Sequence, residues 1–122
     1  MVAAFAAAVT LRDAEDWVGA ERILRRILKG SDDVPPAVNA VLGHVLWKQA
    51  QFTEAIPFLR RAAEQSPTNE GISLALFHCL FEGGRPADAI SEGQRFLLLA
   101  GESPEYREVL EAVKGEFKRR NT

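Results

Sequence analysis

The chain contains two histidines, His44 and His78, which stand 34 residues apart. Neutral imidazoles on adjacent helices could share a metal ion, but two ligands are too few for a closed zinc site. Cys79 follows His78 directly, so on a helix it points about 100° away from that imidazole, and no carboxylate clearly completes a ligand set. We therefore expect no metal centre. The expected role of both histidines is polar contact to a partner, which protonation could modulate.

The remaining polar residues do not assemble a catalytic group. The serines have no evident base beside them, and no glycine-rich loop could cradle a phosphate. Gly83-Gly84 has the composition of a tight turn. We therefore expect a protein that is not an enzyme and that carries no cofactor, so its function should lie in binding.

Composition limits the kinds of partner. The formal net charge of -2 argues against general nucleic-acid binding, which needs a basic surplus. The basic residues that close the chain suit a helix end, where cations complement the helix dipole. They are Lys118, Arg119 and Arg120. These features leave a protein or peptide as the expected partner.

The chain is expected to work in the cytoplasm without inserting into a membrane. No apolar run approaches the roughly 18 residues that cross a bilayer. The apolar start, Met1–Val9, has no Lys or Arg before it, which favours a first helix over a signal peptide. The single cysteine, Cys79, excludes an intrachain disulfide and fits a reducing compartment.

Apolar residues recur at spacings of three and four, which predicts helices and no strand pair. Turn residues separate seven helical stretches. Their expected spans are Val2–Ala14, Trp17–Lys29, Pro36–Gln49, Thr53–Gln65, Glu70–Glu82, Pro86–Leu99 and Pro104–Arg119. Very short breaks within each pair predict antiparallel hairpins. Pro57 should fall near the first turn if Thr53 is the N-cap, and should bend its helix if that helix starts earlier.

The helical pattern repeats along the chain. At an offset of 34, Leu42 matches Leu76 and Ala55 matches Ala89. Towards the N-terminus the offset becomes 35, and the extra residue falls in the loop near Asp33 to Pro35, where an insertion costs little. Two helices per unit of this length predict a stack of hairpins, in which each unit packs only on its neighbours.

This pattern resembles the tetratricopeptide repeat (TPR) family. The second unit carries it best, in Leu42, Gly43, Leu46, Ala55, Leu59, Ala62 and Pro67. The resemblance covers the whole chain and implies an all-α fold, a right-handed superhelix of antiparallel helical hairpins with seven helices. It implies one domain, 1–122, with repeats at about 1–34, 36–69 and 70–103 and a capping helix at 104–119.

The third unit departs from the family pattern. Small residues let the paired helices approach elsewhere, at Ala8, Gly43, Ala20, Ala55 and Ala89. Phe77 is large where the family has glycine, and Gly93 is small where the family has a bulky residue. We expect these two to compensate in volume, with Phe77 filling the space that Gly93 leaves.

In such a stack, the first helix of each hairpin lines a concave groove. The residues that helical spacing places there are Phe5, Val9, Arg12, Ala40, His44, Trp47, Lys48, Leu74, His78 and Phe81. This lining is apolar and aromatic, which is typical of a binding surface. The alternative is a tighter curvature, in which these residues pack on one another.

The family's carboxylate-clamp subtype is not expected here. That subtype holds a partner's C-terminus with Lys, Arg and Asn side chains in the groove. The matching places are Phe5, Val9, Val41, Gly71 and Ala75. None of these side chains could bind a carboxylate as the clamp does.

The sequence therefore predicts an adaptor or chaperone-like module that binds an apolar or amphipathic peptide or helix in its groove. The alternative is a self-associating structural module, because the helix Val2–Val9 is apolar around most of its circumference. The same exposed helix would suit a fragment of a longer repeat array.

Overall fold

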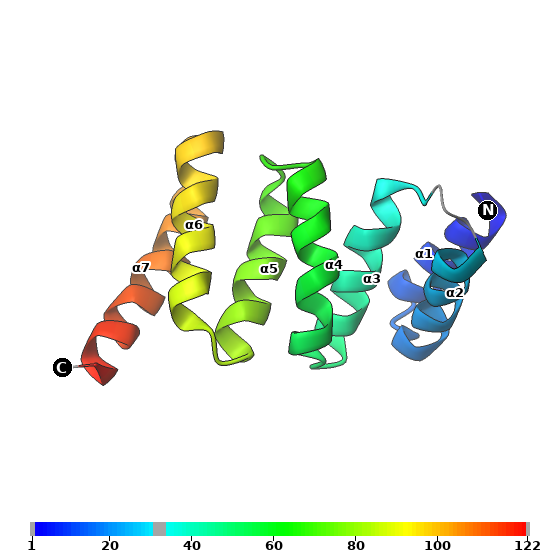
Figure 1. The fold of residues 1–122 in the computed structure, drawn as a ribbon, viewed down its shortest axis with the longest axis horizontal. Helices are drawn as coiled ribbons and strands as arrows, with labels where there is room; N and C mark the ends of the chain where they lie inside the picture. Colours follow the sequence, from blue (N-terminus) through cyan, green and yellow to red (C-terminus); the bar gives the residue numbers. More distant parts are fainter. Residues whose placement is uncertain (1, 31–33, 122) are drawn as a thin grey trace.

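The computed structural model describes residues 2–30 and 34–121. Helical hairpins stand side by side in chain order, with the two termini at opposite ends of the row (Figure 1). The helices are α1 (Val2–Asp13), α2 (Trp17–Gly30), α3 (Pro36–Lys48), α4 (Phe52–Gln65), α5 (Glu70–Glu82), α6 (Pro86–Ala100) and α7 (Pro104–Arg120). The described ranges contain no strand, so the predicted all-α fold of seven helices is confirmed. Asp33, in the loop predicted to hold the extra residue, lies outside these ranges.

The helix bounds agree with the expected spans to within a residue at each end. One difference concerns α4, which begins at Phe52 with Gln51 as N-cap, so the helix starts earlier than Thr53, the second of the two alternatives. The Gln51 carbonyl accepts the first helical hydrogen bond, from the Ala55 N–H at 3.0 Å, and Phe52 packs partly buried against the core. Pro57 consequently lies inside the helix, beyond the first turn. Its missing N–H would be harmless only within the first turn.

The turn inside each hairpin repeats one backbone geometry. Glu15, Ala50 and Gly84 occupy equivalent positions and have positive φ angles of 61°, 60° and 81°. The next residue donates its N–H to the carbonyl five residues earlier, at 2.8–2.9 Å. These bonds run from Asp16 to Leu11, from Gln51 to Leu46 and from Arg85 to Leu80. Only the third turn uses glycine, the residue that adopts positive φ without strain. The repeat is therefore structural even where the residue types differ.

Close helix approach inside the second hairpin depends on Gly43. A Cβ built on Gly43 would stand 2.5 Å from Leu59 Cγ and 3.3 Å from the Leu59 backbone nitrogen. Both residues are buried, so α3 and α4 meet closely at this point. The equivalent residue of the first unit, Ala8, is completely buried as well. Small residues at this position thus set the spacing of the paired helices, as the sequence predicts.

The space beside Gly93, which the sequence predicts Phe77 to fill, is bounded most closely by side chains of α7. The atoms nearest to a Cβ built on Gly93 belong to Leu110, at 3.0 Å, and to Tyr106, at 3.3 Å. Both residues come from α7, so the capping helix occupies the space beside Gly93. Phe77 instead meets the Tyr106 ring edge-on, with centroids 5.7 Å apart. The two departures of the third unit therefore form a seat for α7.

The first helices of the hairpins contact one another along the row, α1 with α3 and α3 with α5. Helix α7 continues this layer, because it packs on α6 and its Tyr106 reaches Ser73 of α5. We call the exposed side of α1, α3, α5 and α7 the first-helix face, which is the side that the sequence predicts to be concave. Within the described residues, no helix combines the length and apolarity needed to cross a membrane.

Candidate partner-binding surface

All ten residues that the sequence predicts for the groove lie on the first helices of the hairpins. They come from α1, α3 and α5: Phe5, Val9, Arg12, Ala40, His44, Trp47, Lys48, Leu74, His78 and Phe81. Lys48 is exposed, and the other nine are half-buried. Side chains of this kind pack against the core on one side and present surface on the other. They could therefore contact a partner without leaving the core.

A ladder of rings crosses this face from α2 to α5. The rings of Trp17 and His44 lie 6.1 Å apart, and those of His44 and Trp47 lie 5.7 Å apart, each pair edge-on. Trp47 then stacks in parallel on His78 at 5.7 Å. The sequence did not point to Trp17, because its position near the start of a second helix matches the core residue Phe52. The ladder thus joins all three units through rings from three helices.

Trp47 is already in contact with groups of this chain on more than one side. His78 stacks on its ring, and the Lys48 Nζ lies 4.8 Å from the ring centroid, a distance suited to a cation–π interaction. At this end of the face, the predicted lining therefore packs partly on itself. Trp47 contributes to the shape of the surface, and the room for a partner's side chain lies elsewhere.

That room is a hollow between α3 and α5. It has a volume of about 260 Å³, and its walls are almost entirely apolar. The residues that line it are Ala40, His44, Leu59, Asn69, Gly71, Ile72 and Ala75. The hollow exists because Ala40, Gly71 and Ala75 are small where the two helices face one another. This run of small residues is the sequence signal that could have located it.

One polar atom in the wall of the hollow has no protein partner. The Nδ1 of His44 is buried and makes no hydrogen bond with the described residues. Burial lowers the pKa of His44, and the nearby cations Lys48 and Arg12 lower it further. Burial also lowers the pKa of His78, which the Glu82 carboxylate partly offsets. Both imidazoles are consequently neutral at pH 7 and can accept a hydrogen bond.

These histidines should make stability depend on pH. Their pKa values are lowered below 6.5 in the folded chain, so the unfolded chain binds more protons as pH falls through that value. Stability is therefore expected to decrease between about pH 7 and pH 5. Urea unfolding at several pH values, followed by circular dichroism, measures this. The His44→Gln/His78→Gln double variant should show a flatter profile, and an identical profile would contradict the assignment.

Geometry does not favour a metal shared by the two histidines. Trp47 makes ring contacts with both imidazoles, which places its indole between them. No set of three possible metal ligands occurs in the part of the chain that the structure describes. Burial raises the pKa of the Cys79 thiol to about 12, so this side chain behaves as a small apolar core residue.

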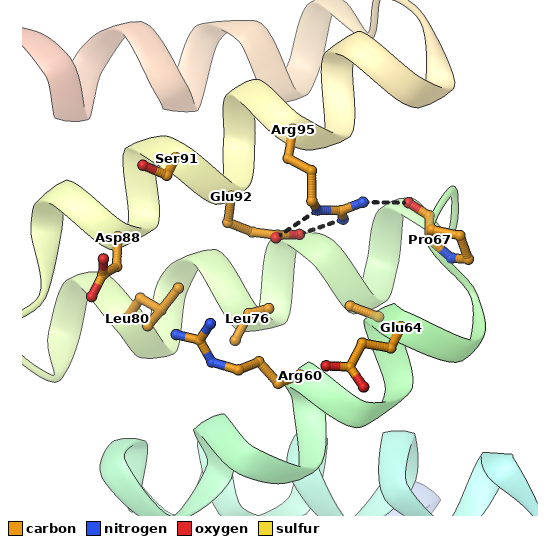
Figure 2. A pocket seen from close by; sticks show the side chains of 10 residues that line it. Arg60, Glu64, Pro67, Leu76, Leu80, Asp88, Ser91, Glu92 and Arg95 are labelled. Atoms are coloured by element: carbon orange, nitrogen blue, oxygen red, sulfur yellow. Dashed lines mark hydrogen bonds and ion pairs between the residues drawn. The ribbon is translucent and has the colours of Figure 1, made fainter.

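The opposite side of the row carries a second cleft, of about 460 Å³, between α4 and α6 (Figure 2). Arg95 donates to both Glu92 carboxylate oxygens, at 2.8 and 2.6 Å, and to the Pro67 carbonyl at 3.0 Å. Glu92 is only 9% exposed and also accepts the Ser73 hydroxyl at 2.6 Å. Because that hydroxyl has one proton, Tyr106 must donate to Ser73 Oγ, 2.8 Å away.

The polar side chains at the base of this cleft hydrogen-bond to one another. Its buried carboxylate is satisfied by groups from α5 and α6, and the network fastens α7 through Tyr106. Burial raises the Tyr106 pKa to about 12, so the phenol stays protonated and donates. The sequence pattern does not identify this network. The cleft therefore contributes to stability.

A row of antiparallel helix pairs with a 34-residue period and an apolar hollow in its first-helix layer defines a helical-repeat protein. The family model for the tetratricopeptide repeat matches residues 46–113, which is more than half of the chain. The chain therefore belongs to the tetratricopeptide repeat family. The match runs from the end of α3 through α4, α5 and α6 and into α7.

Solved structures share this fold. MamA AMB-1 superposes with a TM-score of 0.82 at 20% identity, over 97% of this chain and 69% of that chain. MamA MSR-1 gives 0.81 at 21% identity, over 94% of this chain and 66% of that chain. The Yersinia enterocolitica type III secretion chaperone SycD, in complex with a peptide of the translocator YopD, gives 0.77 at 17% identity, over 98% and 92%. Comparison with curated proteins gives no match.

Proposed function

We propose that this chain is a protein-interaction module that holds an apolar segment of a partner on its first-helix face. The hollow between α3 and α5 is the observation that carries the proposal. Its volume of about 260 Å³ lies below the roughly 300 Å³ at which small-molecule pockets begin. It suits a peptide side chain better than a cofactor. Burying one large apolar side chain contributes about 1.5–3 kcal/mol.

The surroundings of the hollow supply what a bound segment would also need. The His44 imidazole, which is neutral, lines the hollow beside the position of that side chain. Leu74 and Phe81 extend the apolar surface along α5. The chaperone SycD, which shares the fold, is known in complex with a peptide, so a module of this shape can act by holding one. An adaptor or chaperone-like role in the cytoplasm follows as our proposal.

Filling the hollow tests this function. A Cβ on Gly71 would meet nothing nearer than Asn69 Oδ1 at 3.5 Å, so a side chain can begin there without a clash, and Gly71→Leu is designed to fill the hollow that this residue lines. Leucine also has a higher helix propensity than glycine, so the variant should fold. Short random peptides displayed on phage are selected on the wild type and on this variant. We expect the wild type to enrich apolar peptides and Gly71→Leu to lose them.

The matched control is Gly115→Leu in α7, where a Cβ would meet only Arg119 Nη1, at 3.9 Å. This variant makes the same exchange in a helix but lies away from the hollow. It should enrich the same peptides as the wild type. If Gly71→Leu enriches them equally well, the hollow is not the binding site and the proposal is wrong.

Self-association through α1 is the second candidate. Val2 is 85% exposed, and Ala3, Ala6 and Ala7 are exposed beside it on the same helix. Light scattering over a wide concentration range tests it, with Ala6→Glu as the disrupting variant. A dimer that Ala6→Glu dissociates would support this candidate. A wild-type monomer at every concentration would exclude it.

A further inference from the structure

We infer that the segment held on the first-helix face is cationic as well as apolar: its anchor side chain fills the hollow, and Lys or Arg side chains beside the anchor meet the carboxylates of Glu105 and Glu108 on α7. This inference rests on the proposed function and names the chemistry of the partner.

The repeat register places both carboxylates in line with the hollow. At an offset of 34, Glu105 is equivalent to Gly71, which lines the hollow. Two such offsets relate Glu108 to Ala40, which also lines it. Equivalent positions on successive first helices point to the same side of a helical-repeat row. Glu105 and Glu108 therefore continue the rows of hollow-lining residues onto the next helix.

The buried residues of α7 show which way this helix is turned about its own axis, and this agrees with the repeat register. Tyr106 and Leu110 are completely buried, and Tyr106 bonds to Ser73 of α5. With about 100° per residue, Glu105 and Glu108 lie roughly 100° and 160° around the helix from Tyr106. Arg107 lies on the opposite flank, where it pairs with Glu102 and Glu111. Both Glu105 and Glu108 are exposed.

These carboxylates lack a basic neighbour in the described chain. Glu108 has no ion pair there, and Glu105 accepts only the Ser103 hydroxyl, at 3.4 Å. Glu82, at the end of α5, is also exposed and without a salt bridge among the described residues, but it lies beside the start of α4 and not at the hollow. An unneutralised row of carboxylates beside an apolar hollow complements a segment that carries both apolar and cationic side chains.

The other end of the face has the opposite sign. Arg12, which pairs with Asp13 at 3.0 Å, lies on α1, and Lys48 lies at the end of α3. Lys48 has no carboxylate partner in the described residues, and it repels a second cation. The charge difference along the row therefore orients the segment, with its cations towards α7. Neighbouring first helices lie about 8–10 Å apart, so the cation should follow the anchor by roughly three residues in an extended segment.

The test uses the same displayed peptides with charge variants of the full chain. Peptides enriched by the wild type and lost on Gly71→Leu are sequenced, and the strongest is synthesised. We expect these peptides to be rich in Lys or Arg. On Glu105→Gln/Glu108→Gln the synthetic peptide should bind roughly two- to thirtyfold more weakly, as expected for two exposed ion pairs. Added salt should weaken its binding to the wild type far more than to the variant.

The control is Glu64→Gln/Asp88→Asn, which removes the same charge from the cleft on the other side of the row (Figure 2). It should leave the affinity within twofold of the wild type. Hollow-dependent peptides without Lys or Arg, or an affinity unchanged by Glu105→Gln/Glu108→Gln, would overturn this inference and leave the proposed function standing. An absence of hollow-dependent peptides would instead overturn both.

Discussion

Replacing Tyr106 by alanine is expected to lower the free energy of unfolding by about 3–5 kcal/mol, the cost of deleting a large buried ring. Tyr106 is 0% exposed and stacks on Phe96 with centroids 5.0 Å apart. It also meets Phe77 edge-on and donates to Ser73. Its loss would remove the main contact between α7 and α5. Urea unfolding followed by circular dichroism measures the change.

Tyr106→Phe separates the ring from the hydroxyl. This variant keeps the stacking and loses only the hydrogen bonds to Ser73, so it should cost about 1 kcal/mol. Ser73 keeps its bond to Glu92 at 2.6 Å, which limits the damage. If Tyr106→Ala proved as stable as Tyr106→Phe, α7 would not be fastened by this ring, and our account of the capping helix would be wrong.

Replacing Arg95 by methionine is expected to destabilise the fold by about 3 kcal/mol. Removing one partner of a buried ion pair usually costs about 3–5 kcal/mol, because the other charge stays buried. Glu92 is 9% exposed and would lose two hydrogen bonds, at 2.6 and 2.8 Å. Arg95 keeps 33% of its side chain in water, so we expect the lower end of that range.

Two further variants show whether this cost comes from the stranded carboxylate. Adding Glu92→Leu to Arg95→Met should recover much of the stability, because no buried charge then remains. Arg107→Met removes an arginine that pairs with Glu102 and Glu111 on the exposed side of α7, and it should leave the unfolding midpoint nearly unchanged. Equal losses for Arg95→Met and Arg107→Met would contradict the distinction between buried and exposed pairs.

The fold could be predicted from the sequence because the repeat is a local pattern. Spacings of three and four define each helix, and Leu42, Gly43 and Ala55 mark how the second hairpin packs. The positive φ angles of Glu15 and Ala50 could not be predicted from residue type, since neither is glycine. They follow from the register of the repeat, which places Gly84 at the equivalent turn.

The polar network and the seat for α7 were beyond sequence reasoning for a different reason. Ser73, Glu92 and Tyr106 come from three helices, and none of them has a distinctive spacing from the others. Gly93 and Phe77 were noticed as departures, but which side chain fills the space depends on how α7 packs. Contacts between distant segments decide such details, and a single sequence does not display them.

The candidate binding surface was partly predictable. Helical spacing brought His44, Trp47 and His78 to one face, as expected. It did not show that the Trp47 ring would be covered by His78 and Lys48. Nor did it show that the free volume would lie between α3 and α5. Free volume is a difference between side-chain sizes and helix spacing, so it appears only when both are known. The aromatic residues therefore indicate the first-helix face, and the small residues indicate the position of the hollow on it.

The most direct test of the proposed binding surface is to map a bound peptide on the labelled protein by nuclear magnetic resonance. The peptide selected on the wild type is titrated into it, and amide shifts are followed residue by residue. Our account predicts that the largest shifts belong to the hollow, at Ala40, Gly71 and Ala75. Shifts confined to the opposite cleft, at Arg60, Asp88 and Arg95, would contradict it.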